Sequence, residues 1–223
     1  MCGRYAITSA PEAIRQLFGY PEQPNFPPRY NVAPTQPVPI VRTHESRRQF
    51  ALVRWGLIPS WVKDPRSFSL LINARGESVA DKPAFRNAMR RRRCLFPADG
   101  FYEWKKSGKT KQPYLLQMAD ERPFVFAGLW ERWSKSQPSI ESCTIITTTA
   151  NTLAADIHDR MPVMLTEAAA TLWLDREVKD ADSLMPLLVP YPADAMVAYP
   201  VSPLVNSPLH DSADCIQPVK SLF

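Results

Sequence analysis

The sequence has few of the residues that hold metal ions or build disulfide frameworks. Its 223 residues include four cysteines and three histidines, with no C-x-x-C or H-E-x-x-H spacing. A zinc site is therefore not expected, and we expect no other metal and no cofactor. A disulfide framework is not expected either, because the cysteines are scattered along a chain of this length that carries no secretion signal.

The sequence also lacks long apolar stretches. No run approaches the roughly 18 apolar residues of a membrane-spanning helix. The start of the chain has no apolar signal segment, because Arg4 and Arg15 bracket a polar N-terminus. We therefore expect a cytoplasmic protein with no membrane partner.

The chain has an ordinary globular composition, with an excess of positive charge. Hydrophobic residues make up 45% and charged residues 22% of the sequence, and the net charge is +5. There is no internal repeat and no domain boundary, so residues 1–223 are interpreted as one domain. Arg86 and the arginine run at 90–93 concentrate the charge. A solvated helix face is one explanation for this cluster, but four adjacent arginines repel one another, which favours an anionic partner.

The pattern of elements indicates an α+β fold dominated by antiparallel strands. Ser9 and Glu12 have capping-box spacing and predict a short helix that Gly19 ends. Asp81 and Thr166 predict the starts of two further helices, and the proline-rich stretch 21–39 predicts an irregular path. We expect a barrel-like core with flanking short helices, its strands formed by residues 50–58, 68–72, 94–96, 114–118, 124–129 and 143–149.

Cys2 is the first candidate for chemistry. Such a small second residue lets methionine aminopeptidase remove Met1, which leaves an α-amine and a thiol on one carbon skeleton. The pKa values of these groups are about 7.7–8.0 and about 8.5, so both are partly deprotonated near neutral pH. This 1,2-aminothiol can capture an aldehyde as a Schiff base and then close a thiazolidine ring. The alternative is that Cys2 merely permits the removal of Met1.

Two further segments place polar groups in unusual surroundings. Glu103 lies between Tyr102 and Trp104, and partial desolvation there would raise its pKa and suit it to proton transfer. The alternative is an exposed carboxylate on an edge strand. Asn73 and Arg75 would face the same side of an extended segment, unless they are a turn asparagine and a solvated arginine.

His158 is the leading candidate among the histidines for an acid or a base. It stands beside Asp159 and Arg160, whereas His44 lies in a polar stretch and His210 lies near the C-terminal tail. A lone histidine is more often structural than catalytic, so its neighbours carry this assignment.

Together these segments resemble the SRAP family, the SOS response-associated peptidases that are also called abasic-site processing proteins. The motifs occur in the family's order from Cys2 to about Ile216, so the resemblance covers nearly the whole chain. It rests on six segments: Met-Cys-Gly-Arg at 1–4, Tyr-Asn-Val-Ala-Pro-Thr at 30–35, Trp-Gly-Leu-Ile-Pro at 55–59, Asn-Ala-Arg at 73–75, Gly-Phe-Tyr-Glu-Trp at 100–104 and His-Asp-Arg-Met-Pro at 158–162.

The resemblance implies a protein that crosslinks covalently to abasic sites in single-stranded DNA and protects the lesion in the DNA damage response. Cys2 would supply the amine and the thiol for the ring-opened sugar aldehyde. Asn73 would hold the Cys2 backbone or the sugar, Glu103 would move protons during ring opening and imine formation, and His158 would act as a second acid or base or grip the sugar or a phosphate.

The resemblance also implies a set of DNA contacts. Positions that match phosphate-binding arginines are Arg4, Arg75 and Arg160, which fits the charge excess. Trp61 resembles a wedge that stacks on bases. Arg86 and the arginine run at 90–93 either extend the DNA track or lie on a helix outside it, and the role of the run stays open. We expect a monomer that associates with the nucleoid when it is bound to DNA.

Two other functions stay open at this point. Cys2, His158 and Glu103 could be the nucleophile, base and orienting group of a cysteine peptidase, which could also remove Met1 in cis. A non-catalytic single-strand binder that uses only arginines and tryptophans would instead be indifferent to Cys2.

Overall fold

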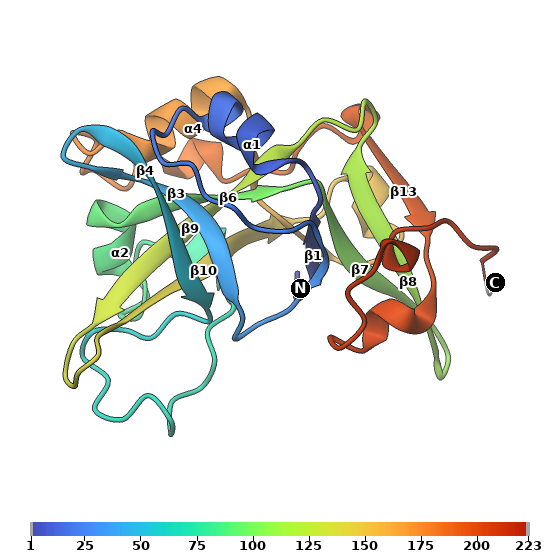
Figure 1. Cartoon of the computed structure of the whole chain (residues 1–223), viewed down its shortest axis with the longest axis horizontal. Helices are drawn as coiled ribbons and strands as arrows, with labels where there is room; N and C mark the ends of the chain where they lie inside the picture. The colour runs from blue at the N-terminus through green and yellow to red at the C-terminus, as the bar shows by residue number, and fades with distance from the viewer. Residues whose placement is uncertain (1, 222–223) are drawn as a thin grey trace.

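A ring of strands forms the centre of the molecule (Figure 1). The computed structural model describes residues 2–221, so Met1 and its expected removal lie outside the described residues. Five strands pair in succession and close on themselves, because the last pairs with the first: β10 (Ile140–Thr149), β4 (Arg47–Trp55), β3 (Pro37–His44), β6 (Arg93–Ala98) and β9 (Phe124–Trp133).

Strand β10 is the most connected strand of the ring. Besides its two ring neighbours it pairs with β5 (Asn73–Arg75) and with β11 (Arg160–Pro162). The short strand β12 (Met164–Leu165) extends the ring sheet beside β9. Pairing is antiparallel throughout the ring sheet except where β10 meets β4 and β5.

A second, antiparallel sheet stands beside the ring, on the right in Figure 1. Its strands are, in order, β13 (Met196–Pro200), β8 (Thr110–Met118), β7 (Gly100–Ser107), β1 (Tyr5–Ile7) and β2 (Arg29–Val32). The chain crosses from the ring to this sheet at Asp99, between β6 and β7. The Asp99 carboxylate accepts the backbone N–H groups of Thr8 and Ser9, at 2.6 and 2.9 Å, and so fixes the exit of β1 against the crossing point.

Short helices flank the two sheets. The α-helices are α1 (Pro11–Phe18), α2 (Arg86–Arg91), α3 (Thr152–Ala155) and α4 (Glu167–Leu174). Single turns of 3-10 helix are η1 (Gly76–Ser78), η2 (Met185–Leu187), η3 (Ala193–Ala195), η4 (Pro203–Asn206) and η5 (Ala213–Cys215). The predicted α+β fold with a barrel-like core and flanking helices is confirmed. Within residues 2–221 no helix has the length and apolar character that crossing a bilayer requires.

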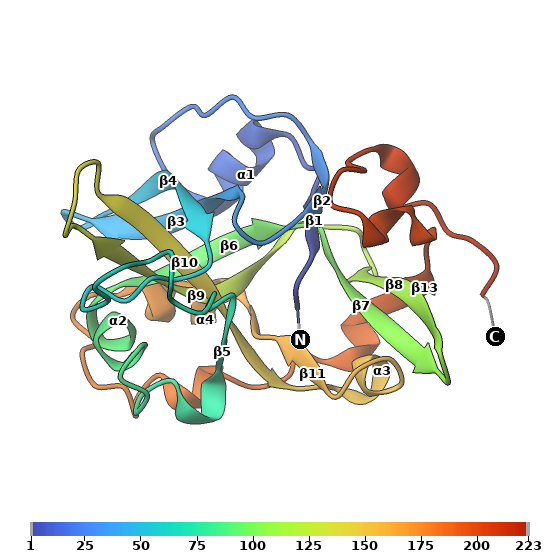
Figure 2. The same cartoon turned by 90° about the horizontal axis from the view of Figure 1, so that it is seen from below.

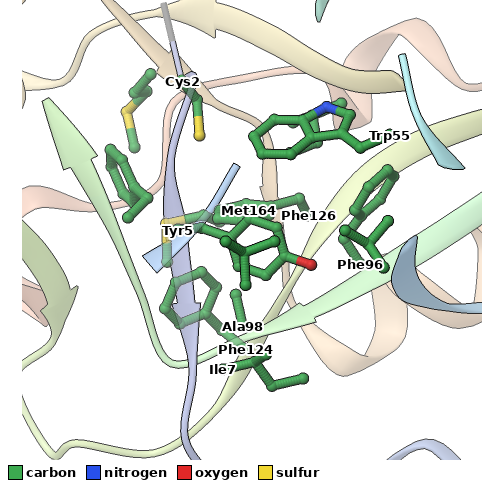
Figure 3. Close-up of a cluster of buried hydrophobic side chains, with 14 of the residues drawn as sticks. Cys2, Tyr5, Ile7, Trp55, Phe96, Ala98, Phe124, Phe126 and Met164 are labelled. Carbon is green, nitrogen blue, oxygen red and sulfur yellow. The ribbon is translucent and has the colours of Figure 1, made fainter. Parts of the chain in front are cut away.

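The largest part of the core lies where the ring and the second sheet meet. The Tyr5 ring of β1 contacts Trp55 and Phe126 edge to face, with centroids 5.5 and 6.1 Å apart. Figure 3 shows this cluster, with the sulfur of Cys2 pointing toward it near Trp55. Burial of such aromatic side chains is the dominant stabilising term, and it holds the N-terminal segment between the two sheets.

The predicted capping box at the first helix is wrong. Ala10 is the N-cap of α1, without a side-chain capping bond, and the Ser9 hydroxyl instead donates to Asp99. The charged Asp99 carboxylate, between β6 and β7, binds Ser9 through both its hydroxyl and its backbone N–H and so holds it away from the helix N-terminus. The predicted end is confirmed, because Gly19 adopts the left-handed conformation with φ of +65°.

The other two predicted helix starts had different outcomes. Asp81 caps no helix, since α2 begins five residues later with Phe85 as its N-cap. Residues 81–85 form turns instead. Thr166 is the N-cap of α4, and its side-chain oxygen accepts the N–H of Ala169 at 3.3 Å.

The prolines at 21–39 do not prevent strand formation. This stretch includes β2 and the start of β3, which contains Pro37 and Pro39. Only Val41 and Arg42 of β3 pair with β6, so both prolines lie where β3 pairs on one side alone, as strand prolines require. The predicted strand at 68–72 is wrong. This segment makes only an isolated bridge, between Leu71 and Leu57.

Candidate active site around Cys2

Cys2 lies between the two sheets, on the segment that leads into β1 (Figure 2). The residue is fully buried, and its Sγ contacts the Arg4 carbonyl oxygen at 3.8 Å. Burial, with a smaller contribution from the charge of Glu103, raises the pKa of the thiol well above its ordinary value. Asn73 Nδ2 donates to the Cys2 carbonyl oxygen at 2.8 Å, so β5 holds this residue through its backbone.

Glu103 faces this residue from β7 of the second sheet. Its side chain is buried, as expected from its neighbours, with only 3% of the residue exposed. Burial raises the pKa of the carboxyl from 4.5 to about 7, and the negative charge of Asp159 adds to the effect. The negative charge of Glu103 in turn contributes to the raised pKa of the Cys2 thiol, so the two groups are close enough to act on each other electrostatically. A carboxyl with this pKa can both accept and donate a proton at neutral pH.

His158 lies just before β11. Its Nδ1 is 3.0 Å from the backbone N of Arg160 and 2.9 Å from Asp159 Oδ1. The neutral ring accepts the Arg160 N–H, and the protonated ring can donate to the Asp159 carboxylate instead. Partial burial lowers the pKa of His158, so the ring is mainly neutral at pH 7 and available as a base.

Two arginines border this group on strands that pair with β10. Arg75 ends β5 and is exposed. Arg160 begins β11, and its guanidinium forms a two-pronged ion pair with Glu77, at 2.5 and 2.9 Å. It also donates to the Thr147 carbonyl oxygen of β10 at 2.7 Å. A phosphate at Arg160 would therefore share the guanidinium with Glu77.

Arg4 is engaged with the C-terminal tail. Its Nη1 donates to Asn31 Oδ1 and to the Val205 carbonyl oxygen, both at 2.7 Å. Asn31 in turn is fully buried and donates to the carbonyl oxygens of Ser207 and His210, at 2.9 and 2.6 Å. Arg4 therefore has structural partners at the place where the resemblance implies a phosphate contact.

Asp211 completes this arrangement from the tail side. Its carboxylate accepts the N–H groups of Tyr30 and Asn31, at 2.6 and 2.9 Å, and pairs with Arg29. We call Arg4, Asn31 and Asp211, with the groups they bind, the tail clamp. It ties the segment that carries Cys2 to residues near the other end of the chain.

Trp61 and Arg86 stand outside these contacts. Trp61 is 52% exposed on the loop after β4 and contacts Phe68 edge to face at 5.6 Å. The loop is tied down by Lys135, which donates to the Trp61 carbonyl oxygen. Arg86 is exposed at the first residue of α2.

The arginine run does not form one cationic helix face. Arg93 is only 6% exposed and donates to backbone carbonyl oxygens. Arg92 pairs with the buried Glu131 at 2.9 Å. Arg92 and Arg93 are thus engaged with a carboxylate and with backbone carbonyl oxygens of the protein itself, whereas Arg90 and Arg91 are exposed.

Three contributors to the site were not singled out from the sequence. Asp159 acts on both His158 and Glu103, and Glu77 occupies the guanidinium of Arg160. Asn31 anchors the tail clamp. Each of them lies in or just beyond a segment already noted, but which charge each would face depends on strand pairing that the sequence does not display. Among residues 2–221 no group of three or more His, Cys, Asp or Glu side chains could hold a metal ion.

Comparison with known sequences decides the family. A sequence model of the family described as SOS response associated peptidase (SRAP) matches residues 1–208. The chain belongs to the SRAP family. The resemblance seen in the six sequence segments is thereby confirmed.

Relatives match this SRAP chain over almost its full length. It is 43% identical over 222 residues to the abasic site processing protein YoqW of Bacillus subtilis, covering 97% of this chain and 99% of that protein. It is 33% identical to the abasic site processing protein YedK of Escherichia coli, covering 98% and 100%. A crystal structure of a protein from Bacteroides thetaiotaomicron has the same fold, with a TM-score of 0.88, 27% identity and coverage of 98% and 100%.

Proposed function

We propose that this SRAP protein processes abasic sites in single-stranded DNA by forming a thiazolidine crosslink through Cys2, and so protects the lesion in the DNA damage response. The observation that carries the proposal is the group around Cys2. Asn73 holds its backbone, and a buried carboxyl with a pKa of about 7 interacts with its thiol. The names of YoqW and YedK as abasic site processing proteins support the same substrate.

The chemistry begins with the removal of Met1, which turns the Cys2 nitrogen into a free α-amine. The ring-opened abasic sugar carries an aldehyde at C1′. The amine adds to this carbonyl carbon, and loss of one water gives an imine. The thiol then adds across the C=N bond: sulfur bonds to carbon, and nitrogen gains a proton. The second step releases nothing and is intramolecular, which favours closure of the five-membered ring.

Glu103 is the proton carrier in this scheme. Because burial raises the pKa of the thiol, thiolate is scarce at neutral pH, and the sulfur needs a nearby proton acceptor when it attacks. Glu103 can take this proton, and in its protonated form it can assist the loss of water from the amine adduct. His158, mainly neutral, supplies a second base.

The basic residues at the border suit the DNA backbone. Arg75 is exposed and lies two residues after Asn73. Arg75 pairs with Thr147 of β10 and Arg160 pairs with Thr149, two residues further along that strand. Two guanidinium groups at this spacing can contact phosphates near the lesion and position the sugar. We assign stacking on bases to Trp61, whose ring is half exposed.

A denaturing gel tests the crosslink. A single-stranded oligonucleotide with one uracil is treated with uracil glycosylase, incubated with protein and heated before electrophoresis. Wild type should give a heat-stable adduct. Cys2→Ala keeps an amine that can make only the reversible imine, so the stable adduct should disappear while some strand cleavage by β-elimination persists. Cys215→Ala is the matched control, because it removes another fully buried thiol.

Undiminished heat-stable adduct with Cys2→Ala would exclude the proposal. Mass analysis of the N-terminus belongs to the same experiment, because a retained Met1 blocks the amine and should abolish the adduct. The same gel also tests the alternative of a non-catalytic single-strand binder. Such a protein should bind intact and abasic strands equally, and its complexes should dissociate on denaturation.

The site gives less support to a cysteine peptidase that acts in trans. A peptidase nucleophile is an accessible thiol with a lowered pKa, whereas the Cys2 thiol is enclosed and its pKa is raised. Cleavage of a protein substrate by wild type but not by Cys2→Ser would reverse this ranking.

A further inference from the structure

A cationic hollow is lined by residues at the ends of α2 and α4 and in the segment after α4. Figure 1 shows both helices on the side of the ring away from the second sheet. The volume of the hollow is about 380 Å³, and five of its lining residues are basic: Arg90, Arg91, Arg93, Arg176 and Lys179. No carboxylate side chain lines it. We call it the α2–α4 pocket. Its volume is in the range of small-ligand sites, and its charge selects for anions.

The floor of this pocket carries a fixed positive charge. Arg93 is buried, and its Nε, Nη1 and Nη2 donate to five backbone carbonyl oxygens, those of Trp173, Met89, Arg90, Asp175 and Val178. All five donors are therefore occupied, and its charge is balanced by dipoles, with no ion pair to a carboxylate found within residues 2–221. The charge stays in place and attracts an anion without contacting it.

The direct contacts would come from the rim. Arg90, Arg91 and Arg176 are exposed, and no ion pair involves them in the described part of the chain. Lys179 has a loose partner, since its Nζ is 4.0 Å from Glu177. Three guanidinium groups without carboxylate partners around one hollow match the oxygen atoms of a phosphate group.

The surroundings restrict the size of the anion. Two adjoining hollows share part of the wall of the α2–α4 pocket and contain carboxylates. One shares Arg176 and Lys179 and is also lined by Asp175 and Glu177. The other shares Arg90 and Lys179 and is also lined by Asp81, Asp180 and Asp182. A long nucleic-acid strand crossing the pocket would meet these negative charges, whereas a compact anion would not.

We propose that the α2–α4 pocket binds a terminal or free phosphate group through Arg90, Arg91 and Arg176. The phosphate is either a free one, such as pyrophosphate or a nucleotide, or the 5′-phosphate at the end of a DNA strand. The chemistry of recognition is the same for both sources. This binding needs neither Cys2 nor the crosslink, so it stands or falls separately from the proposed function.

Calorimetric titration at low salt tests the pocket, with pyrophosphate as the probe. Wild type should bind it saturably, and the triple variant R90Q/R91Q/R176Q should bind about tenfold more weakly or worse. The matched control is K109Q/K111Q/R122Q, which removes three exposed positive charges from the second sheet and its neighbourhood and should bind like wild type. Thermal melting of all three proteins verifies that they are folded.

Two oligonucleotides of one sequence, with 5′-phosphate or 5′-hydroxyl, distinguish the sources. If the triple variant loses affinity only for the phosphorylated strand, the pocket holds a strand end. If the triple variant loses affinity for pyrophosphate but binds both strands with equal affinity, the pocket holds a free phosphate. Absence of saturable pyrophosphate binding by wild type, or equal weakening in the control variant, would overturn the proposal. Cys2→Ala should keep pyrophosphate binding unchanged.

Discussion

Replacing Glu103 by glutamine should change how the stability of the protein depends on pH. Burial raises the pKa of this carboxyl from 4.5 to about 7 in the folded protein, so folding favours the protonated form. The stability that this form contributes is complete below pH 4.5, is lost as pH rises toward 7 and stays lost above it. The shift of about 2.5 pH units corresponds to about 3 kcal/mol, at about 1.4 kcal/mol per unit. Glutamine has no such titration.

The assay is urea denaturation of wild type and Glu103→Gln at a series of pH values from acidic to mildly alkaline. As the pH rises from acidic values to 7.5, the free energy of unfolding of the variant should increase by about 3 kcal/mol relative to that of wild type. Most of this change should occur between pH 5 and 7. Glu177→Gln is the control, because it removes the same charge from a side chain that is 88% exposed. A difference between wild type and Glu103→Gln that stays constant across this range would refute the assignment of a buried, shifted carboxyl.

Three other substitutions test separate parts of the structure. Arg93→Met removes five hydrogen bonds to buried carbonyl groups and should cost at least about 3 kcal/mol in urea denaturation, whereas Arg86→Ala on the exposed face of α2 should stay within about 0.5 kcal/mol of wild type. Asn73→Ala frees the Cys2 carbonyl and should slow adduct formation about fivefold in a gel time course, as expected for one hydrogen bond of about 1 kcal/mol; an unchanged rate would remove Asn73 from the site. Gly128→Ala would bring a Cβ to 2.3 Å from an aromatic ring of β6 and should lower stability by about 1–3 kcal/mol or more, seen as a lower melting temperature.

The sequence contained enough information to predict the fold class but not the sheet connections. The strand-like runs at 114–118, 124–129 and 143–149 identified β8, β9 and β10, because most of the residues in these runs are apolar or β-branched and are buried in the structure. It could not identify β10 as the strand that four others pair with, since two of these pairings are parallel and join segments far apart in the chain. Strand β3 could not be predicted for the same reason. A strand tolerates proline only where one of its edges is unpaired, and that depends on the sheet connections.

The candidate site was predictable in its residue types and not in its charges. Cys2, Asn73 and Glu103 were selected individually, and the structure places them together. The roles of the arginines depended on partners that no local pattern reveals. Arg160 faces Glu77, Arg4 faces the tail, and both interactions span many residues of sequence. Long-range ion pairs of this kind follow from strand register, which a single sequence does not display.

The tail clamp joins segments that lie far apart in the chain, so it can form only late in synthesis. The N-terminus leaves the ribosome first, but the groups that fix it, from Val205 to Asp211, are among the last to be made. An unfinished chain that lacks these residues carries Cys2 on a segment that the clamp does not hold. Under the proposed function, full reactivity toward a sugar aldehyde should therefore appear only once the residues of the clamp have been made.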